Sequence, residues 1–119
     1  MILVDSSVWI THFHKKNEEL AAYLVECRVL THPFIIGELA LGSIPRRLET
    51  LQMLALLPES ARARDEEVCS LIERQKLIGT GIGYIDAHLL ASACLSGVKL
   101  WTLDRRLHEA AVRLGVSGN

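Results

Sequence analysis

Residues 1–7, MILVDSS, indicate the fold class of this chain of 119 residues. Four apolar residues stop abruptly at Asp5, and so short an aliphatic run is typical of a strand buried in a parallel sheet. We therefore expect a strand over Ile2–Val4. The apolar residues between positions 8 and 13 follow a helical spacing, which predicts a short helix with Asp5 or Ser6 as its N-terminal cap.

The same alternation of short apolar runs and helical patterns continues to the end of the chain. Further strands are expected over residues 28–31, 58–61 and 98–103, with a last one beginning at Val116, and helices over residues 18–26, 34–41, 46–56, 65–77, 85–96 and 104–114. Strands that alternate with helices predict an α/β fold with a parallel sheet covered on both faces. We expect a three-layer α/β/α sandwich with a short parallel sheet of four to five strands.

Length and composition set the broad class of the protein. A chain of 119 residues that is 50% apolar can bury a real core but not two, so we expect one domain over residues 1–119. The net charge of −1 argues against a protein that coats nucleic acid by charge alone. No apolar run approaches the ~20 residues of a membrane span, and residues 1–7 do not resemble a signal peptide. We expect a cytoplasmic protein that does not enter a membrane.

The three cysteines do not suggest a disulfide framework. Cys27, Cys69 and Cys94 lie far apart, form no CxxC pair and are odd in number. In a reducing compartment each is expected to be a small hydrophobic residue of the core.

Two of the four aspartates end predicted strands. Asp5 follows the first strand, and Asp104 follows the strand over residues 98–103. In an open parallel sheet, ligands bind beyond the carboxyl ends of the strands, so neighbouring strands would bring these two carboxylates to one crevice. Each aspartate taken singly is also well placed to cap the helix that follows it.

Two more acids stand beside apolar or glycine-rich segments. Glu38 shares a helix face with Phe34, Ile35 and Leu41. If its carboxylate is buried there, it needs a cation or a hydrogen-bond donor. The alternative is that Glu38 lies at the rim of the apolar face and its side chain reaches solvent. Asp86 opens a helix after a glycine-rich turn, and there it also suits the helix dipole. Four convergent carboxylates would repel one another unless a cation lay between them, and oxygen ligands alone suit Mg²⁺ or Mn²⁺. Such a site supports metal-assisted phosphodiester hydrolysis.

Four segments of the chain resemble, in order and spacing, the acidic motifs of PIN-domain ribonucleases, and most closely the VapC toxins of bacterial toxin–antitoxin pairs. These segments are LVDSSVWI (residues 3–10), IIGELALG (35–42), YIDAHLLASA (84–93) and LWTLDRRL (100–107). The resemblance implies a PIN-like sandwich in which Asp5, Glu38, Asp86 and Asp104 are the catalytic, metal-binding acids. It also implies Mg²⁺- or Mn²⁺-dependent endoribonuclease activity. Because a metal-bound water would be the nucleophile, the products are expected to carry a 5′-phosphate and a 3′-hydroxyl.

The resemblance extends to supporting residues and partners. Ser7 matches a polar position that orients the first acid, and Thr102 matches a hydroxyl position beside the last one. Arg105 and Arg106 directly follow Asp104 and are the best candidates for contacts with RNA phosphates. The partners that the resemblance implies are a VapB-like antitoxin and the RNA substrate. The helices between Glu18 and Leu57 carry more apolar residues than one face needs, which suggests a surface for that antitoxin or for a second copy of the chain in a homodimer.

Two alternative functions remain open on the sequence alone. A haloacid-dehalogenase-like phosphatase also begins with a strand that ends in Asp, but its chemistry needs a second Asp two residues later, where this chain has Ser7. A non-catalytic module that keeps the PIN fold is the other alternative, and the presence of all four acids speaks against it.

Overall fold

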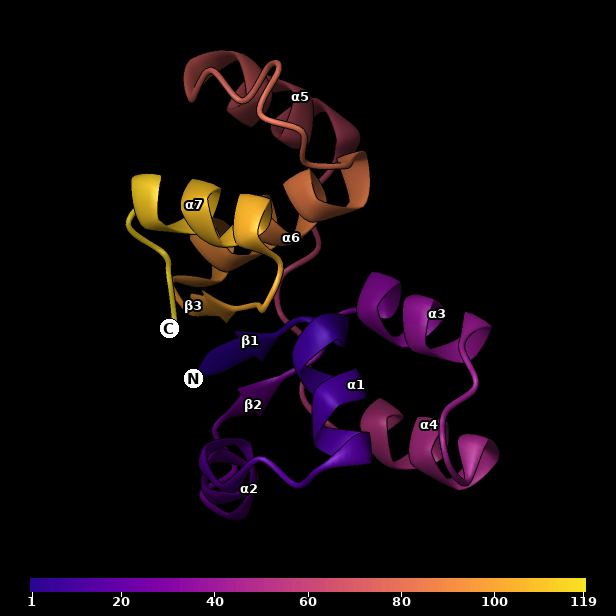
Figure 1. Cartoon of the computed structure of the whole chain (residues 1–119). Helices are drawn as coiled ribbons and strands as arrows, with labels where there is room; N and C mark the ends of the chain where they lie inside the picture. The colour runs from indigo at the N-terminus through magenta and orange to yellow at the C-terminus, as the bar shows by residue number, and fades with distance from the viewer.

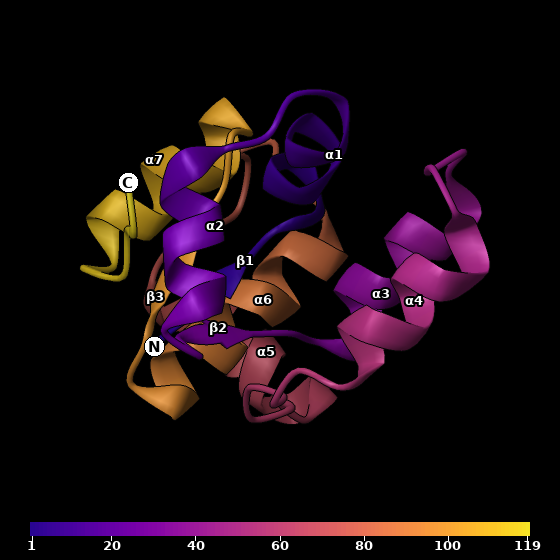
Figure 2. The ribbon, with the colours of Figure 1, turned by 90° about the horizontal axis from the view of Figure 1, so that it is seen from below.

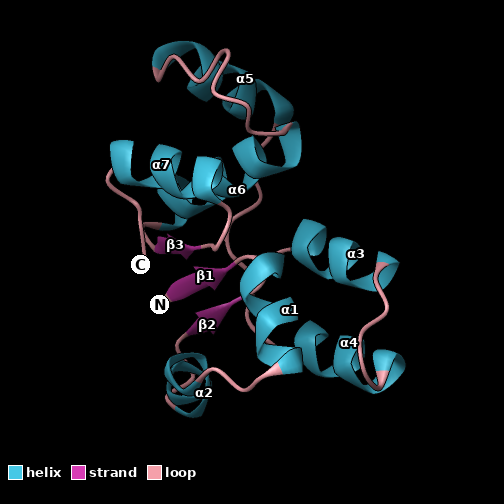
Figure 3. Ribbon diagram, in the orientation of Figure 1, coloured by secondary structure: helices cyan, strands magenta, loops and turns pink.

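The computed structural model describes all 119 residues and contains one parallel sheet of three strands. The strands are β1 (Ile2–Val4), β2 (Val29–Leu30) and β3 (Lys99–Trp101), in the order β2-β1-β3 (Figures 1 and 3). β1 pairs in parallel with both neighbours. The carboxyl ends of all three strands therefore lie at one edge, and β1 and β3 are neighbours, as a shared site for Asp5 and Asp104 requires.

Seven helices surround this sheet: α1 (Ser6–His14), α2 (Glu18–Val25), α3 (Pro33–Leu41), α4 (Arg47–Ala55), α5 (Asp65–Arg74), α6 (Tyr84–Ser96) and α7 (Arg105–Arg113). Figures 1 and 2 together show α1 and α7 on one side of the sheet and α5 and α6 on the other, with α3 and α4 as a pair beside it. The structure thus confirms the predicted α/β architecture with a parallel sheet. No helix is long and apolar enough to cross a membrane.

The predicted count of four to five strands is wrong, because two of the expected strands are single bridges. Residues 58–61 contribute only the parallel bridge Thr31↔Glu59, and the segment after Val116 contributes only Leu100↔Ser117. Pro58 has no backbone N–H to donate, which limits the first segment to an edge contact. In the second segment, the bridge consists of two hydrogen bonds, from the Leu100 N–H to the Val116 carbonyl and from the Gly118 N–H to the Leu100 carbonyl, and no ladder extends from it.

Helix α5 ends at Arg74, three residues before the predicted end at Leu77. The reason is local, because Lys76 has a φ of 53° and right-handed helical backbone cannot continue through it. The other predicted helices agree with the structure to within one or two residues at each end.

The core is a cluster of 24 buried residues that includes every residue of β1 and the apolar face of each helix. None of the three cysteines belongs to it, so the prediction that they are core residues is wrong. On α5 and α6 the buried positions are the neighbours Val68 and Ala93, which turn Cys69 and Cys94 toward solvent. Adjacent residues of a helix point about 100° apart, so one of two apolar neighbours can be buried while the other faces solvent. The sequence does not show which of the two is buried.

Candidate active site

Asp5 lies at the carboxyl end of the central strand and is the most buried carboxylate of the candidate site, 5% exposed. Its Oδ2 accepts hydrogen bonds from the Ser7 hydroxyl at 2.8 Å and from the Thr102 hydroxyl at 2.7 Å. Asp5 stands at the N-cap position of α1, but its side chain makes no capping hydrogen bond. Its carboxylate therefore serves something other than the helix end.

The two hydroxyls also join the loop after β3 to the start of α1. Ser7 Oγ and Thr102 Oγ1 lie 3.3 Å apart, and the backbone N–H of Leu103 donates to Ser7 Oγ at 3.0 Å. The backbone N–H of Asp104 donates to Thr102 Oγ1 at 3.1 Å. One network of hydrogen bonds thus sets the positions of the first and the last acid of the candidate site.

Glu38 reaches toward this network from the middle of α3. Its Oε1 accepts a hydrogen bond from the Ser6 hydroxyl at 3.4 Å. Burial raises the pKa of the Glu38 carboxyl, and the negative charges of Asp5 and Asp86 raise it further, although the Ser6 hydrogen bond lowers it. Glu38 is exposed, which agrees with the alternative of a rim glutamate that reaches solvent, and the charges of Asp5 and Asp86 still act on its carboxyl.

Asp86 lies in the first turn of α6, half-buried. The backbone N–H of Gly83 approaches its Oδ2 at 3.4 Å, a long contact that gives weak capping. Burial raises the pKa of the Asp86 carboxyl; the Gly83 contact opposes that rise, and the charges of Asp5 and Asp104 add to it. The pKa of Asp86 is raised overall, so the Gly83 hydrogen bond does not offset the cost of burying this carboxylate near other negative charges.

Asp104 does act as a helix cap. Its Oδ1 accepts a hydrogen bond from the Leu107 backbone N–H at 2.9 Å at the start of α7. One carboxylate oxygen is therefore engaged, and the charge of Asp104 still contributes to the raised pKa of Asp86.

The four acids influence one another, and no cationic side chain neutralises them. None of Asp5, Glu38, Asp86 and Asp104 takes part in any of the six ion pairs of the structure. No three His, Cys, Asp or Glu side chains stand close enough to hold one ion directly. Mg²⁺ typically keeps several waters and uses one or two protein carboxylates, so a looser ring of acids of this kind fits it. The donor set, carboxylates with no thiol or imidazole, agrees with a hard divalent cation.

Arg105 and Arg106 occupy the first turn of α7 and are both exposed. Neither forms an ion pair with an acid of the chain. The Arg106 side chain lies over Gly81, where a built Cβ would come within 2.6 Å of the Arg106 Nη1 atom. Gly81 has a φ of 85°, so glycine at this position serves both the backbone conformation and the close approach of the arginine.

Two buried histidines near this site carry no recognisable signal in the sequence. His32 caps α3 and is 2% exposed, and His88 on α6 is 5% exposed. The dipeptide His32-Pro33 predicts only a helix start, and a single histidine within an apolar helix gives no indication of its contacts. Their surroundings emerge only from the packing of α3 against α6.

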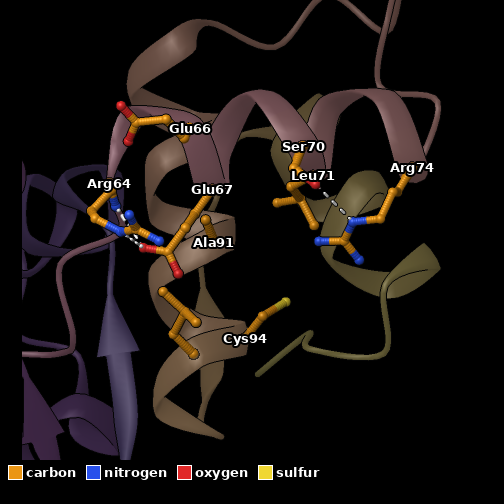
Figure 4. A pocket seen from close by; sticks show the side chains of 9 residues that line it. Arg64, Glu66, Glu67, Ser70, Leu71, Arg74, Ala91 and Cys94 are labelled. Atoms are coloured by element: carbon orange, nitrogen blue, oxygen red, sulfur yellow. Dashed lines mark hydrogen bonds and ion pairs between the residues drawn. The ribbon is translucent and has the colours of Figure 1, made fainter.

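A separate hollow of about 330 Å³ lies between α5 and α6, and none of the four acids lines it. Figure 4 shows its arginines engaged within the chain: Arg64 with Glu67, and Arg74 with the Ser70 hydroxyl at 3.1 Å. With its cations occupied, this hollow does not extend the candidate site.

Known proteins share both the sequence and the fold of this chain. The model of the PIN domain family matches residues 2–113. Two curated proteins named Ribonuclease VapC32, from Mycobacterium tuberculosis strains CDC 1551 / Oshkosh and ATCC 25618 / H37Rv, are each 43% identical over 118 residues, covering 98% of this chain and 95% of theirs.

The crystal structure of PAE2754 from Pyrobaculum aerophilum superposes with a TM-score of 0.60 at 18% identity, over 96% of this chain and 88% of that one. At that identity the likeness concerns the fold alone. The family match and the curated relatives both extend over nearly the whole chain. The chain therefore belongs to the PIN-domain family, among its VapC-type members.

Proposed function

We propose that this protein is a metal-dependent endoribonuclease and the toxin of a toxin–antitoxin pair. The observation that carries the proposal is the state of Asp5, a buried carboxylate held by two hydroxyls, with three further acids around it and no cation. Protein chains rarely bury an unpaired carboxylate without a ligand for it. The curated relatives at 43% identity are named ribonucleases, which agrees with this reading.

In this proposal, Asp5, Glu38, Asp86 and Asp104 hold one or two Mg²⁺ or Mn²⁺ ions. A divalent ion in such a site lowers the pKa of a water molecule and offsets the charge that develops on the phosphate. Neighbouring carboxylates help to raise the pKa values of Glu38 and Asp86, and a cation bound among these acids would oppose that rise.

The residues around the acids have positioning and binding roles in the same proposal. Ser7 and Thr102 hold the Asp5 carboxylate in one orientation through the hydrogen bonds to its Oδ2. The free guanidinium groups of Arg105 and Arg106 would contact the phosphates of the RNA, since phosphate contacts position a nucleic acid without reading its sequence.

The phosphatase alternative is not favoured by the local geometry. A general acid would have to stand two residues after Asp5, but Ser7 occupies that position and donates its hydrogen bond to Asp5 itself. The presence of all four acids speaks against the alternative of a non-catalytic module that keeps the PIN fold.

Binding of a VapB-like antitoxin and formation of a homodimer both need exposed apolar surface. Helix α4 and the residue that follows it carry such a surface. Leu48, Met53 and Leu56 are 71%, 70% and 86% exposed. Beside α4, a groove of about 240 Å³ is lined mostly by apolar side chains from α1, α2 and α4. An amphipathic segment of an antitoxin suits such a groove. We place the protein, with its RNA substrate, in the cytoplasm.

The proposed function is tested by incubating purified protein with RNA, with and without Mg²⁺ or Mn²⁺, and by determining the chemistry of the new ends. Internal cleavage that needs the ion and leaves 5′-phosphate and 3′-hydroxyl ends is the expected result. Cyclic 2′,3′-phosphate ends would contradict the proposal, because they arise from attack by the ribose hydroxyl rather than by water.

A further inference from the structure

The side chain of His32 has one nitrogen occupied and one unpartnered. Its Nδ1 accepts a hydrogen bond from the Phe34 backbone N–H at 3.0 Å, so this nitrogen carries no proton. A neutral ring must then carry its proton on Nε2. That Nε2 is buried and has no hydrogen-bond partner. His32 therefore offers a buried donor without an acceptor, which is a costly arrangement in a folded protein.

Burial supports the neutral state of His32. Burial, and after it the nearby His88 and Arg62, lower the pKa of His32 to about 4, while Glu59 opposes this shift. At neutral pH the Nε2 atom is thus an uncharged N–H donor, for which a carbonyl oxygen or a ring nitrogen is a suitable acceptor.

A cavity of about 450 Å³ opens beside His32, beyond the carboxyl end of β2. An acceptor and an aromatic ring also line it. The Asp65 Oδ1 atom accepts a hydrogen bond from the Tyr84 hydroxyl at 3.1 Å and pairs with His88 Nε2 at 3.2 Å. The other carboxylate oxygen, Oδ2, has no partner in these contacts. Phe34 is 37% exposed, and its ring lies 5.0 Å from the rings of both His32 and His88.

The charges around the cavity do not favour a bare anion. Arg62 and Arg64 line it, but Arg62 pairs with Glu59 at 3.0 Å and Arg64 with Glu67 at 3.3 Å. Asp65 and Glu66 add two negative charges to the same wall. A neutral planar group that accepts from His32, donates to Asp65 and stacks on Phe34 fits these surroundings better than a phosphate does. Among the parts of an RNA, that description fits a base.

The cavity lies next to the candidate active site. Phe34 and Glu38 are one turn apart on α3, which is about 6 Å along the helix axis. On α6, His88 lines the cavity and lies two residues after Asp86, so the cavity and this acid share one short segment of the helix. A nucleotide next to the scissile phosphate is therefore within reach of it.

We propose that the cavity between His32, Phe34 and Asp65 is a base-recognition subsite, which binds the base of one nucleotide adjacent to the scissile phosphate. The His32 Nε2–H donates to an acceptor of the base, the free Asp65 oxygen accepts from a base N–H, and the Phe34 ring stacks on the base. The subsite rests on the proposed RNA-cleaving function and supplies sequence preference to it.

The first test is binding in the absence of cleavage. The probes are the four nucleoside 5′-monophosphates, with ribose 5-phosphate as the control, added to the full chain without divalent ions. The readout is the imidazole ¹H–¹⁵N resonances of His32. A shift that differs among the four bases and is absent with ribose 5-phosphate supports the subsite. Two outcomes would overturn the subsite. One is no shift at millimolar nucleotide, as expected for a cavity that holds only water, and the other is an equal shift with ribose 5-phosphate.

The second test separates the donor of His32 from its role as a helix cap. His32→Asn keeps an oxygen that caps α3 but removes the Nε2–H, whereas His32→Ala removes both. On a pool of RNA of random sequence, His32→Asn should lose on the order of tenfold in base preference beside the cut, and cleavage of the preferred sequences should slow accordingly. An unchanged preference in His32→Asn contradicts the subsite.

Two further variants keep the test decisive where His32→Asn folds poorly. Asp65→Asn still accepts from Tyr84 and His88 but presents an altered edge to the base, and Phe34→Leu removes only a partly exposed ring. Each should change the base preference, and unchanged preference in both overturns the subsite. If the wild-type protein cleaves no RNA, the proposed function fails, and the resonances of His32 still report on the subsite independently.

Discussion

The Thr102 hydroxyl donates to Asp5 Oδ2 at 2.7 Å, a hydrogen bond that joins residues 97 positions apart in the chain. It links the ends of two neighbouring parallel strands, β1 and β3, at the edge of the sheet where Asp5 lies and the chain continues to Asp104. With the Ser7 hydroxyl on the same oxygen, it holds a buried carboxylate that no cationic side chain neutralises.

Replacing Thr102 by Val should therefore impair both stability and cleavage. Valine has the same shape but no hydroxyl, so the buried Asp5 loses one of its two donors, at a cost of about 1–3 kcal/mol in the free energy of unfolding. Cleavage should fall because the carboxylate is no longer held in one orientation. Urea denaturation and an RNA-cleavage assay measure the two effects.

The matched control is Thr50→Val on α4, which removes a hydroxyl that donates to the Pro45 carbonyl at 2.9 Å and makes no contact with the acids. It should cost stability and leave cleavage unchanged. Equal cleavage by wild-type and Thr102→Val protein would show that the hydroxyl does not position Asp5.

Without a divalent ion, the acid cluster should make the protein less stable as the pH rises. Burial and neighbouring negative charges raise the pKa values of Glu38 and Asp86 in the folded state. The folded chain thus binds more protons than the unfolded one between the ordinary and the raised pKa. The stabilisation is complete below the ordinary values and is lost as the pH rises through the raised ones.

Asp86→Asn and Glu38→Gln should accordingly raise the Tm at pH 7 by an amount on the order of a few degrees, and the gain should vanish near pH 4. Glu109→Gln is the control, since Glu109 is exposed and forms no ion pair. Thermal melts across this pH range, in EDTA, provide the measurement. A lower Tm for both variants at pH 7 would refute the repulsion between the acids.

Asp104 combines a capping role with a charge, and two substitutions separate them. Asn caps helices as well as Asp, so Asp104→Asn should keep the stability of the fold while cleavage declines. Asp104→Ala should additionally cost about 1 kcal/mol, because the Leu107 backbone N–H loses its acceptor. Melting curves and cleavage rates of the two variants report on the capping role and the charge separately. Full cleavage by Asp104→Asn would show that Asp104 acts only as a helix cap.

Gly81→Ala should destabilise the turn that precedes Asp86. Its φ of 85° costs a residue with a Cβ about 1–2 kcal/mol, and the Cβ would also displace Arg106. Gly97→Ala is the matched control, since Gly97 has a φ of 64° and nothing within 4 Å of its Cβ position. Urea denaturation should show the larger loss at Gly81, and Arg106→Ala should remove the difference. Equal losses at the two glycines would contradict the contact with Arg106.

The sequence predicted the parallel sheet and the order of the acids because both depend on local patterns. The sequence alone shows two short aliphatic runs, one followed by Asp5 and the other by Asp104. The number of strands was not predictable in the same way, because the segments at Glu59 and Ser117 form single bridges whose extent depends on distant partners. The exposed cysteines were missed because their helix faces are set by packing.

The surroundings of the candidate site depended still more on the tertiary structure. The hydroxyls of Ser7 and Thr102 have a visible place in the motifs, but their shared acceptor, Asp5 Oδ2, appears only once β1 and β3 are paired. The unpartnered Nε2 of His32 likewise follows from burial against α6 and from a tautomer fixed by the Phe34 backbone. No spacing in the sequence encodes either feature.

The central claim is that Asp5 and its neighbouring acids hold a divalent ion that RNA cleavage requires. The most direct measurement is the rate of RNA cleavage in Mg²⁺ for the wild-type protein, the same protein in EDTA, Asp5→Asn and the control Glu109→Gln. The account predicts cleavage by the wild type and the control in Mg²⁺, and cleavage at background level in EDTA and in Asp5→Asn. Full activity in EDTA, or in a folded Asp5→Asn protein, would contradict it.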